Sequence, residues 1–131
     1  MFQKLAIIAA WASILAIAFA TLTHVGFAYS IYYTLAPLLM RPEMRTYAHF
    51  EHVVAFAILG ALFVFAYPRR VIFVFSVVLI SAIALEYMQS LTPVRHGRLI
   101  DAFEKLIGGA LGIFAAHATL WFARKSRRFQ N

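Results

Sequence analysis

Four apolar runs, separated by short charged stretches, constrain this chain more than any other feature of its sequence. The first run is the longest, because Leu5 to Met40 contains no charged residue unless His24 is protonated. Three further runs are Val53–Tyr67, Val71–Leu85 and Leu106–Phe122. A membrane-crossing helix needs about 20 predominantly apolar residues. The runs therefore predict an all-α fold, a four-helix transmembrane bundle formed by a single domain over residues 1–131.

The composition agrees with a membrane protein and excludes several other classes. Hydrophobic residues make up 63% of the chain and charged residues 13%, whereas a soluble domain is roughly half apolar and a quarter charged. The net charge of +7 does not indicate nucleic acid as a partner, because the basic residues lie in short loops and ends where they contact anionic lipid. The chain has no cysteine, which excludes disulfides and thiolate metal sites. We expect no cofactor and no metal.

Charge is segregated between the two sides of the predicted membrane, and this predicts the orientation. All five acidic residues fall on one side: Glu43, Glu51, Glu86, Asp101 and Glu104. The other side holds basic residues alone: Lys4, Arg69, Arg70, Arg124, Lys125, Arg127 and Arg128. Lys and Arg are retained on the cytoplasmic side during insertion. We therefore expect a multi-pass protein of the cell (inner or plasma) membrane, with both termini in the cytoplasm.

The first helix is predicted at about Leu5–Phe27, followed by tyrosines at the outer interface. An alternative is a cleaved signal peptide, because Ala18-Phe19-Ala20 resembles a cleavage site. Against cleavage, apolar sequence continues well beyond Ala20. Further along, the short link Pro68-Arg69-Arg70 predicts an antiparallel pair of helices.

The second and third runs are too short to cross a membrane alone. Each has only 15 uncharged residues, which span about 22 Å against a hydrocarbon core of about 30 Å. Arg69 and Arg70 hold their inner ends together. We therefore expect His52 and Glu86 at or below the outer hydrocarbon boundary, lining a polar pocket that opens outward.

Two helix faces in this region carry groups capable of chemistry. Arg45, His49, His52 and Phe56 recur at helical spacing on one face. The two histidines could ligate a metal, but a hydrogen-bonded pair is favoured, because zinc needs three or four ligands. Glu86 ends an apolar stretch and shares a face with Gln89. It is either part of a structural salt bridge, with Arg95 or Arg98 as the cation, or an acid/base group.

The predicted loop from Thr92 to Arg98 has the highest density of side chains that could bind an anion. Arg95 and Arg98 offer planar bidentate donors to phosphate or carboxylate, although a solvated loop that balances nearby carboxylates is equally compatible. The fourth helix opens with a stripe whose spacing places its members on one face: Asp101, Lys105, Gly108 and Gly112. The two glycines form a G-x-x-x-G pattern for close helix packing, so the Asp101–Lys105 side is expected to face the bundle, where Lys105 would partner Glu86 or Asp101.

These motifs together resemble the VanZ-like family of small membrane proteins over about residues 48–115. Residues 52–60, HVVAFAILG, are similar to the family's H-x-x-x-F-x-x-L-G pattern. Residues 86–112 contain E-x-x-Q, then an arginine, then D-x-x-x-K-x-x-G-x-x-x-G, where the family commonly has Asn in place of Lys105. Ala48-His49 replaces the Asp-Lys often found before the histidine. The resemblance implies a bacterial, multi-span protein whose family's founding member is linked to glycopeptide-antibiotic resistance.

Three functions remain open at this stage. The favoured one is binding or handling of an anionic lipid or lipid-linked cell-envelope precursor. The alternatives are a membrane-embedded enzyme acting on a lipid-linked phosphate and a structural subunit with a membrane-protein partner. The candidate binding residues are Arg95, Arg98, Gln89, Lys105 and His49. The candidate catalytic residues are Glu86, His52 and Asp101. No nucleophile elbow, phosphate-cradling glycine loop or nucleic-acid module is present in the sequence.

Overall fold

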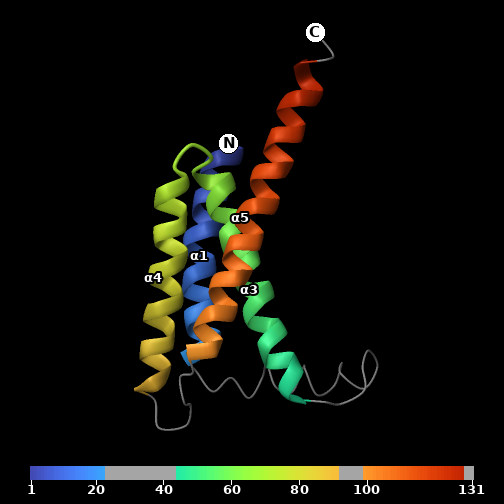
Figure 1. Ribbon diagram of the computed structural model, residues 1–131. Coiled ribbons are helices and arrows are strands. Elements are labelled where there is room, and N and C mark those ends of the chain that lie inside the picture. The colour runs from blue at the N-terminus through green and yellow to red at the C-terminus, as the bar shows by residue number, and fades with distance from the viewer. Residues whose placement is uncertain (23–43, 92–98, 129–131) are drawn as a thin grey trace, which may run out of the picture.

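The chain forms an all-α bundle of long helices that run roughly along one axis (Figure 1). The computed structural model describes residues 1–22, 44–91 and 99–128, and the side chains of 44–50 and 127–128 lie outside that description. Within these ranges there are four helices: α1 (Phe2–Leu22), α3 (Met44–Ala66), α4 (Val71–Ser90) and α5 (Leu99–Arg128). The predicted fold class, an all-α helical bundle, is therefore confirmed.

Three of the helices are long and apolar enough to cross a membrane: Phe2–Leu22, Val71–Ser90 and Leu99–Ser126. The apolar part of α3 is shorter and covers Glu51–Ala66. Many large apolar side chains point outward, including Ile72, Phe114 and Leu15 at more than 70% exposure. An outer surface of this kind is suited to lipid rather than to water.

The helices extend beyond the apolar runs that predicted them. The second run began at Val53, but α3 begins at Met44; the third ended at Leu85, but α4 continues to Ser90. The fourth run is likewise extended at both ends by α5. For the first run, the prediction of Leu5 as the start is late by three residues, and residues 23–27 lie outside the described part. A backbone helix needs no apolar side chains, so the polar residues that flank each run simply continue it.

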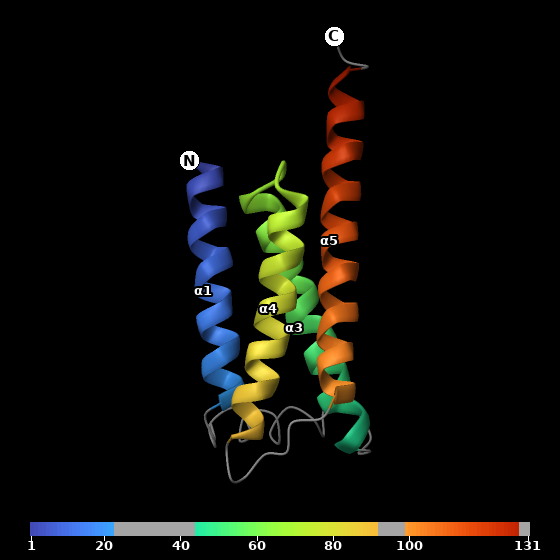
Figure 2. The ribbon, with the colours of Figure 1, turned by 60° about the vertical axis from the view of Figure 1, so that its left-hand side comes forward.

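Helix α3 contacts each of the other three described helices, and in Figure 2 it lies behind α4, between α1 and α5. Its buried side chains Phe56, Leu59 and Phe63 form the middle of the core. From α4 come Val74, Val78 and Ala82, while α1 and α5 complete the cluster with smaller contributions. The most extensive helix pairing is that of α3 with α5.

Glycine makes the α3–α5 pairing possible. A Cβ atom placed on Gly108 would overlap the backbone of Val53, and one on Gly112 would overlap the backbone of Ala57. On the opposite helix, a Cβ on Gly60 would overlap the carbonyl oxygen of Gly109. The predicted G-x-x-x-G face is therefore a true backbone-to-backbone contact, of the kind that small residues allow between membrane helices.

The first residues of α1, the last turns of α5 and the α3–α4 turn lie at the same end of the bundle (Figure 1). The turn is tight, because the Arg70 amide donates to the Tyr67 carbonyl at 3.0 Å. Aromatic rings join three helices there: Trp11 of α1 meets Phe63 at 5.4 Å between centroids, and Tyr67 meets Phe73 of α4 at 5.0 Å. The Trp11 indole also donates to the Tyr67 hydroxyl at 3.1 Å. This end is called the basic end, after its charged side chains: Lys4, Arg69, Arg70, Arg124 and Lys125.

Candidate functional site

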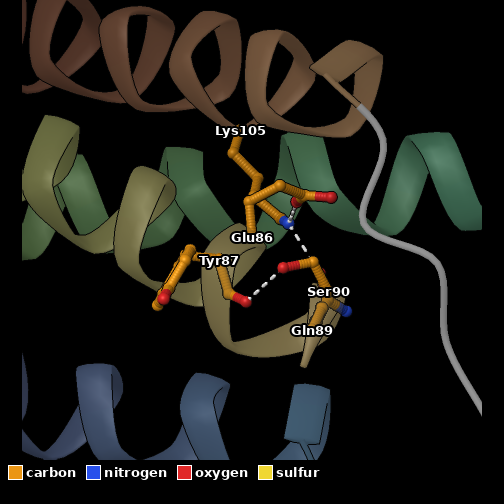
Figure 3. A network of polar contacts seen from close by, with 5 residues as sticks. All are labelled: Glu86, Tyr87, Gln89, Ser90 and Lys105. Atoms are coloured by element: carbon orange, nitrogen blue, oxygen red, sulfur yellow. Dashed lines mark hydrogen bonds and ion pairs between the residues drawn. The ribbon is translucent and has the colours of Figure 1, made fainter. Parts of the chain in front are cut away.

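A buried ion pair between α4 and α5 lies near the end of the bundle opposite the basic end. The Lys105 ammonium group donates to the Glu86 carboxylate and, at 3.1 Å, to the Gln89 side-chain oxygen (Figure 3). Lys105 is 1% exposed, and Glu86 and Gln89 are also buried. Such a lysine has no access to solvent, so its charge must be balanced by these neighbours.

The local sequence explains why the three side chains meet. Glu86 and Gln89 are three residues apart on α4, one turn along the same face. That face continues the buried stripe of Val78, Ala82 and Leu85, so it points into the bundle. Lys105 lies one turn before Gly108, the first of the two glycines at which the α5 backbone contacts the α3 backbone. Because the backbones of α3 and α5 are in contact there, the Lys105 side chain lies inside the bundle, where it pairs with the Glu86 carboxylate.

Three further ionisable groups surround this pair. His52 of α3 is half-buried and lies within electrostatic range of Lys105, Glu86, Asp101 and Glu104. Asp101 and Glu104 are partly buried on the first turns of α5. We call the set formed by His52, Glu86, Gln89, Asp101, Glu104 and Lys105 the polar cluster. It draws on three helices, α3, α4 and α5. The outward-opening pocket expected at this end stays a prediction.

The cluster contains most, but not all, of the predicted site residues. The three candidate catalytic residues, His52, Glu86 and Asp101, are brought together, as are the candidate binding residues Gln89 and Lys105. Arg95 and Arg98 lie outside the described residues. His49 is in α3, but its side chain lies outside the description too. Lys105 faces the bundle, as its stripe predicted, and its ammonium group donates to Glu86 and Gln89.

The structure identifies Lys105 as the cation in the salt bridge of Glu86. The sequence suggested Arg95 or Arg98 as its cation and, separately, Lys105 as a partner of Glu86 or Asp101. Within the described residues the cation is Lys105. The same stripe spacing that predicted the α5 packing face, Lys105 to Gly108 to Gly112, already placed this lysine toward the bundle. The stripe on α5 was therefore the better guide to the partner of Glu86, because helical spacing indicates which way the Lys105 side chain points. The nearness of Arg95 and Arg98 to Glu86 in the sequence gives no such direction.

The environments of two ionisable side chains, Glu104 and His117, were not predicted from the sequence. The sequence placed Glu104 only among the acidic residues on one side of the membrane, yet it lies within electrostatic range of His52 in the cluster. His117 lies further along α5, and its Nε2 atom is buried without a hydrogen-bond partner among the described residues. Spacing gave a usable signal for Glu104, which is three residues from Asp101. His117 stands alone in an apolar run and gave none.

The arrangement has clear chemical limits. Within the described ranges, no group of three or more His, Asp or Glu side chains gathers so as to hold a metal ion. Carboxylates outnumber cations in the described cluster, with Glu86, Asp101 and Glu104 against Lys105. An anionic ligand would therefore have to be held by cations outside this set.

Comparison of the chain with protein-family models, with curated proteins and with solved structures finds no significant match. The fold and the cluster thus define the class of protein on their own. It is a small all-α helical bundle with membrane-spanning helices and a buried ion pair near one end.

Proposed function

We propose that this protein binds the head group of an anionic lipid, or of a lipid-linked cell-envelope precursor, at the end of the bundle that carries the polar cluster. In this proposal the basic end faces the cytoplasm and the polar cluster faces outward, because Lys and Arg are retained inside during insertion. The membrane is the plasma membrane, and the ligand enters from its outer leaflet.

The observation that carries the proposal is the buried pair of Lys105 and Glu86. A buried ion pair is a poor device for stability alone, since apolar residues of similar volume often stabilise a fold as well or better. Ionisable groups inside membrane segments mark ligand and ion pathways more often than they serve packing. Here the pair lies beside three further ionisable side chains on the same three helix ends.

Arg95 and Arg98 are assigned to the head group in this proposal. They belong to the segment that joins α4 to α5, and Arg98 directly precedes Leu99, the first residue of α5. Arg recognises phosphate through two parallel hydrogen bonds, which Lys cannot reproduce. Lys105 acts as a positioning residue, because it orients Glu86 and Gln89. Asp101, Glu104 and His52 complete the polar lining.

The resemblance of residues 48–115 to the VanZ-like family belongs to the proposal as well. It implies a bacterial envelope setting, which suits a lipid-linked precursor as ligand. The departure at Lys105 coincides with the cation of the ion pair. The Asn that is common in that family carries no charge, so a charged pair with Glu86 would be a feature in which this chain differs from the family pattern.

Retained lipid is the direct test. Purify the wild type, the double variant Arg95→Lys/Arg98→Lys and Glu86→Gln in mild detergent, and identify bound lipid by mass spectrometry. We expect the wild type to retain a specific phosphorylated lipid and the double variant to lose at least about tenfold in affinity for it, roughly 1.4 kcal/mol. The matched control is Arg69→Lys/Arg70→Lys, which makes the same change at exposed positions of the basic end.

The alternatives give different outcomes in the same experiment. An enzyme would turn the lipid over, and Glu86→Gln would abolish turnover while the lipid stays bound. A structural subunit would co-purify with a partner protein and show no lipid preference in any variant. The same bulk phospholipid mixture in all four proteins would refute the head-group site.

A further inference from the structure

An apolar groove runs along the seam between α4 and α5 and ends at the basic end of the bundle. Its volume is about 550 Å³, within the range of sites that hold small molecules. On α4 its lining runs from Val71 to Leu79, and Leu106 and Ala110 line it from α5. Val71 directly follows Arg70, the exposed residue that precedes α4. We call the end at Val71 the mouth of the groove, and it begins next to a cation.

The length of the groove matches one leaflet of a membrane. Val71 and Leu79 are eight residues apart, about 12 Å along α4, and half of a hydrocarbon core is about 15 Å. Both helices are candidate membrane spans, and the wall residues Ile72 and Phe75 are 84% and 48% exposed. The groove therefore lies open to lipid chains over the depth of one ordinary acyl chain. Glu86 lies about 10 Å further along α4, so the polar cluster is not part of it.

Helix α5 carries an aromatic ring and two cations to the mouth of the groove. Arg124 follows Leu106 by 18 residues, about five turns, so the two lie on one face. Trp121 follows Ala110 by 11 residues, about three turns, and shares that face. The Lys125 ammonium group lies 5.2 Å from the centroid of the Trp121 ring. The groove face of α5 therefore ends in exposed aromatic and basic side chains.

The last turns of α5 project beyond the α3–α4 turn (Figures 1 and 2). Lys105 pairs with Glu86, which is 15 residues from the start of α4, and the same distance along α5 ends at Leu120. The residues that follow therefore pass the end of α4 and enter the head-group layer, which is about 5–8 Å thick on each side of a bilayer. Arg124 and Lys125, about 6 Å beyond Leu120, lie at the depth of lipid phosphate.

The charge of this end favours an anionic lipid over other occupants. Among the described residues the basic end has no acidic side chain, because all four described acidic residues lie at or beside the polar cluster: Glu51, Glu86, Asp101 and Glu104. Cations at head-group depth attract anionic lipids, and a tryptophan there is a typical interfacial anchor. An acidic protein segment would instead need cations that stand clear of the membrane surface.

We infer that the α4–α5 groove holds one acyl chain of an anionic phospholipid from the leaflet at the basic end, and that Arg70, Arg124 and Lys125 at its mouth hold the phosphate. The site takes a phospholipid with a net negative head group, such as phosphatidylglycerol. It lies at the opposite end of the bundle from the proposed head-group site, and neither site depends on the other.

Tryptophan fluorescence reports on this site, because the chain has only two tryptophans. Trp11→Phe leaves Trp121 at the mouth as the single fluorophore. This protein is placed in phosphatidylcholine vesicles that contain either phosphatidylglycerol or phosphatidylcholine with brominated acyl chains, which quench a neighbouring indole. Lipid at the polar cluster does not quench Trp121, because Lys105 is about 24 Å away along α5.

The measurement is made at about 1 M salt, where a Debye length of about 3 Å removes diffuse attraction to the basic end. Quenching by the two lipids then gives the ratio of their association constants at Trp121. We expect phosphatidylglycerol to be preferred at least about threefold, within the range for an exposed ion pair. Equal quenching by the two lipids would overturn the anionic site.

A matched pair of lysine variants tests the cations. Lys125→Gln should lower the preference for phosphatidylglycerol at least about twofold. Lys4→Gln makes the same change at the same end, but on α1, which does not pack against α5 in the described part of the chain. It should leave the preference unchanged. Equal effects of the two variants would show attraction to the whole basic end and would overturn the site at the seam.

Two variants fill the groove at exposed positions: Ala110→Phe from α5 and Ser76→Phe from α4. Each should bring quenching by the two lipids close to equality, because the lipid loses the surface that holds its chain. The matched control is Ala115→Phe, which lies on the exposed face of α5 opposite Leu106 and should change nothing. Circular dichroism identifies any variant that fails to fold, and the other groove variant then gives the answer.

The remaining outcomes overturn the inference in different ways. A preference for phosphatidylglycerol that survives both groove variants would remove the groove from the site. An equal loss of preference in Ala115→Phe would show a general disturbance of α5. Absence of quenching by either lipid would show that a second copy of the chain or another protein covers the seam. Each of these results leaves the proposed function to its own test with retained lipid.

Discussion

Removing the cation of the buried pair should destabilise the bundle strongly. Lys105→Met keeps the length and the apolar stem of the side chain but deletes the charge that the Glu86 carboxylate receives. Because Lys105 is 1% exposed and Glu86 is buried as well, solvent cannot replace the lost partner. Stranding one member of a buried pair costs about 3–5 kcal/mol. We therefore expect a loss of free energy of unfolding in that range.

Lys125→Met is the matched control. Lys125 is exposed near the other end of the same helix, and its ammonium group lies over the Trp121 ring at 5.2 Å from the centroid. An exposed cation–π contact contributes only about 0.5–1 kcal/mol. The two substitutions are chemically identical, so their difference isolates the effect of the buried position.

A double-mutant cycle completes the measurement. Glu86→Gln alone leaves the lysine charge without its carboxylate, and it should also be costly. In Lys105→Met/Glu86→Gln no charge is stranded, so the loss should be smaller than the sum of the two single losses by at least about 1 kcal/mol. Unfolding is followed in detergent micelles by circular dichroism. Equal losses for Lys105→Met and Lys125→Met, or strict additivity in the cycle, would refute the description of Lys105 as a buried, paired cation.

Two further predictions concern packing and orientation. Gly112→Ala should cost about 1–3 kcal/mol, because its Cβ meets the backbone of Ala57 and the helices must separate, whereas Gly109→Ala should cost less, because its Cβ overlaps a methyl group of the Val78 side chain and no backbone atom. Melting curves of the two variants compare them, and a larger loss for Gly109→Ala would contradict the assigned contacts. Reporter fusions in the α3–α4 turn and after Asn131 should score cytoplasmic and a fusion near Thr92 external; a cytoplasmic score at Thr92 would reverse the orientation and the outward site with it.

The sequence predicted the helices well because their signal is local. Uninterrupted apolar runs such as Val71–Leu85 are required by the membrane itself, and the tight link at residues 68–70 leaves α3 and α4 no choice but to run antiparallel. The ends of the helices were missed because hydropathy measures the solvent around a side chain and not the backbone conformation. Glu86 to Ser90, for example, continue α4 although the apolar run has ended.

The candidate site was only partly predictable for a different reason. Helical spacing identified the shared faces of Glu86 with Gln89 and of Lys105 with the glycines, and the structure has both. Which cation reaches Glu86 depends on the distance between α4 and α5, and no pattern within one helix encodes that distance. An apolar groove between α4 and α5, with Phe75, Leu79 and Leu106 in its walls, was not predicted at all, because it arises from how two apolar helices lie against each other.

Packing and charge in α5 form a single arrangement rather than two separate features. Lys105, Gly108 and Gly112 lie at intervals of three and four residues on one stripe of the helix. The glycines let the α5 backbone touch that of α3, and this contact fixes how deeply the lysine enters the bundle. With a larger residue at Gly108, the helices would separate and the Lys105 ammonium group would move away from Glu86. The close helix contact is therefore what allows a lysine side chain to be held inside a membrane bundle at this position.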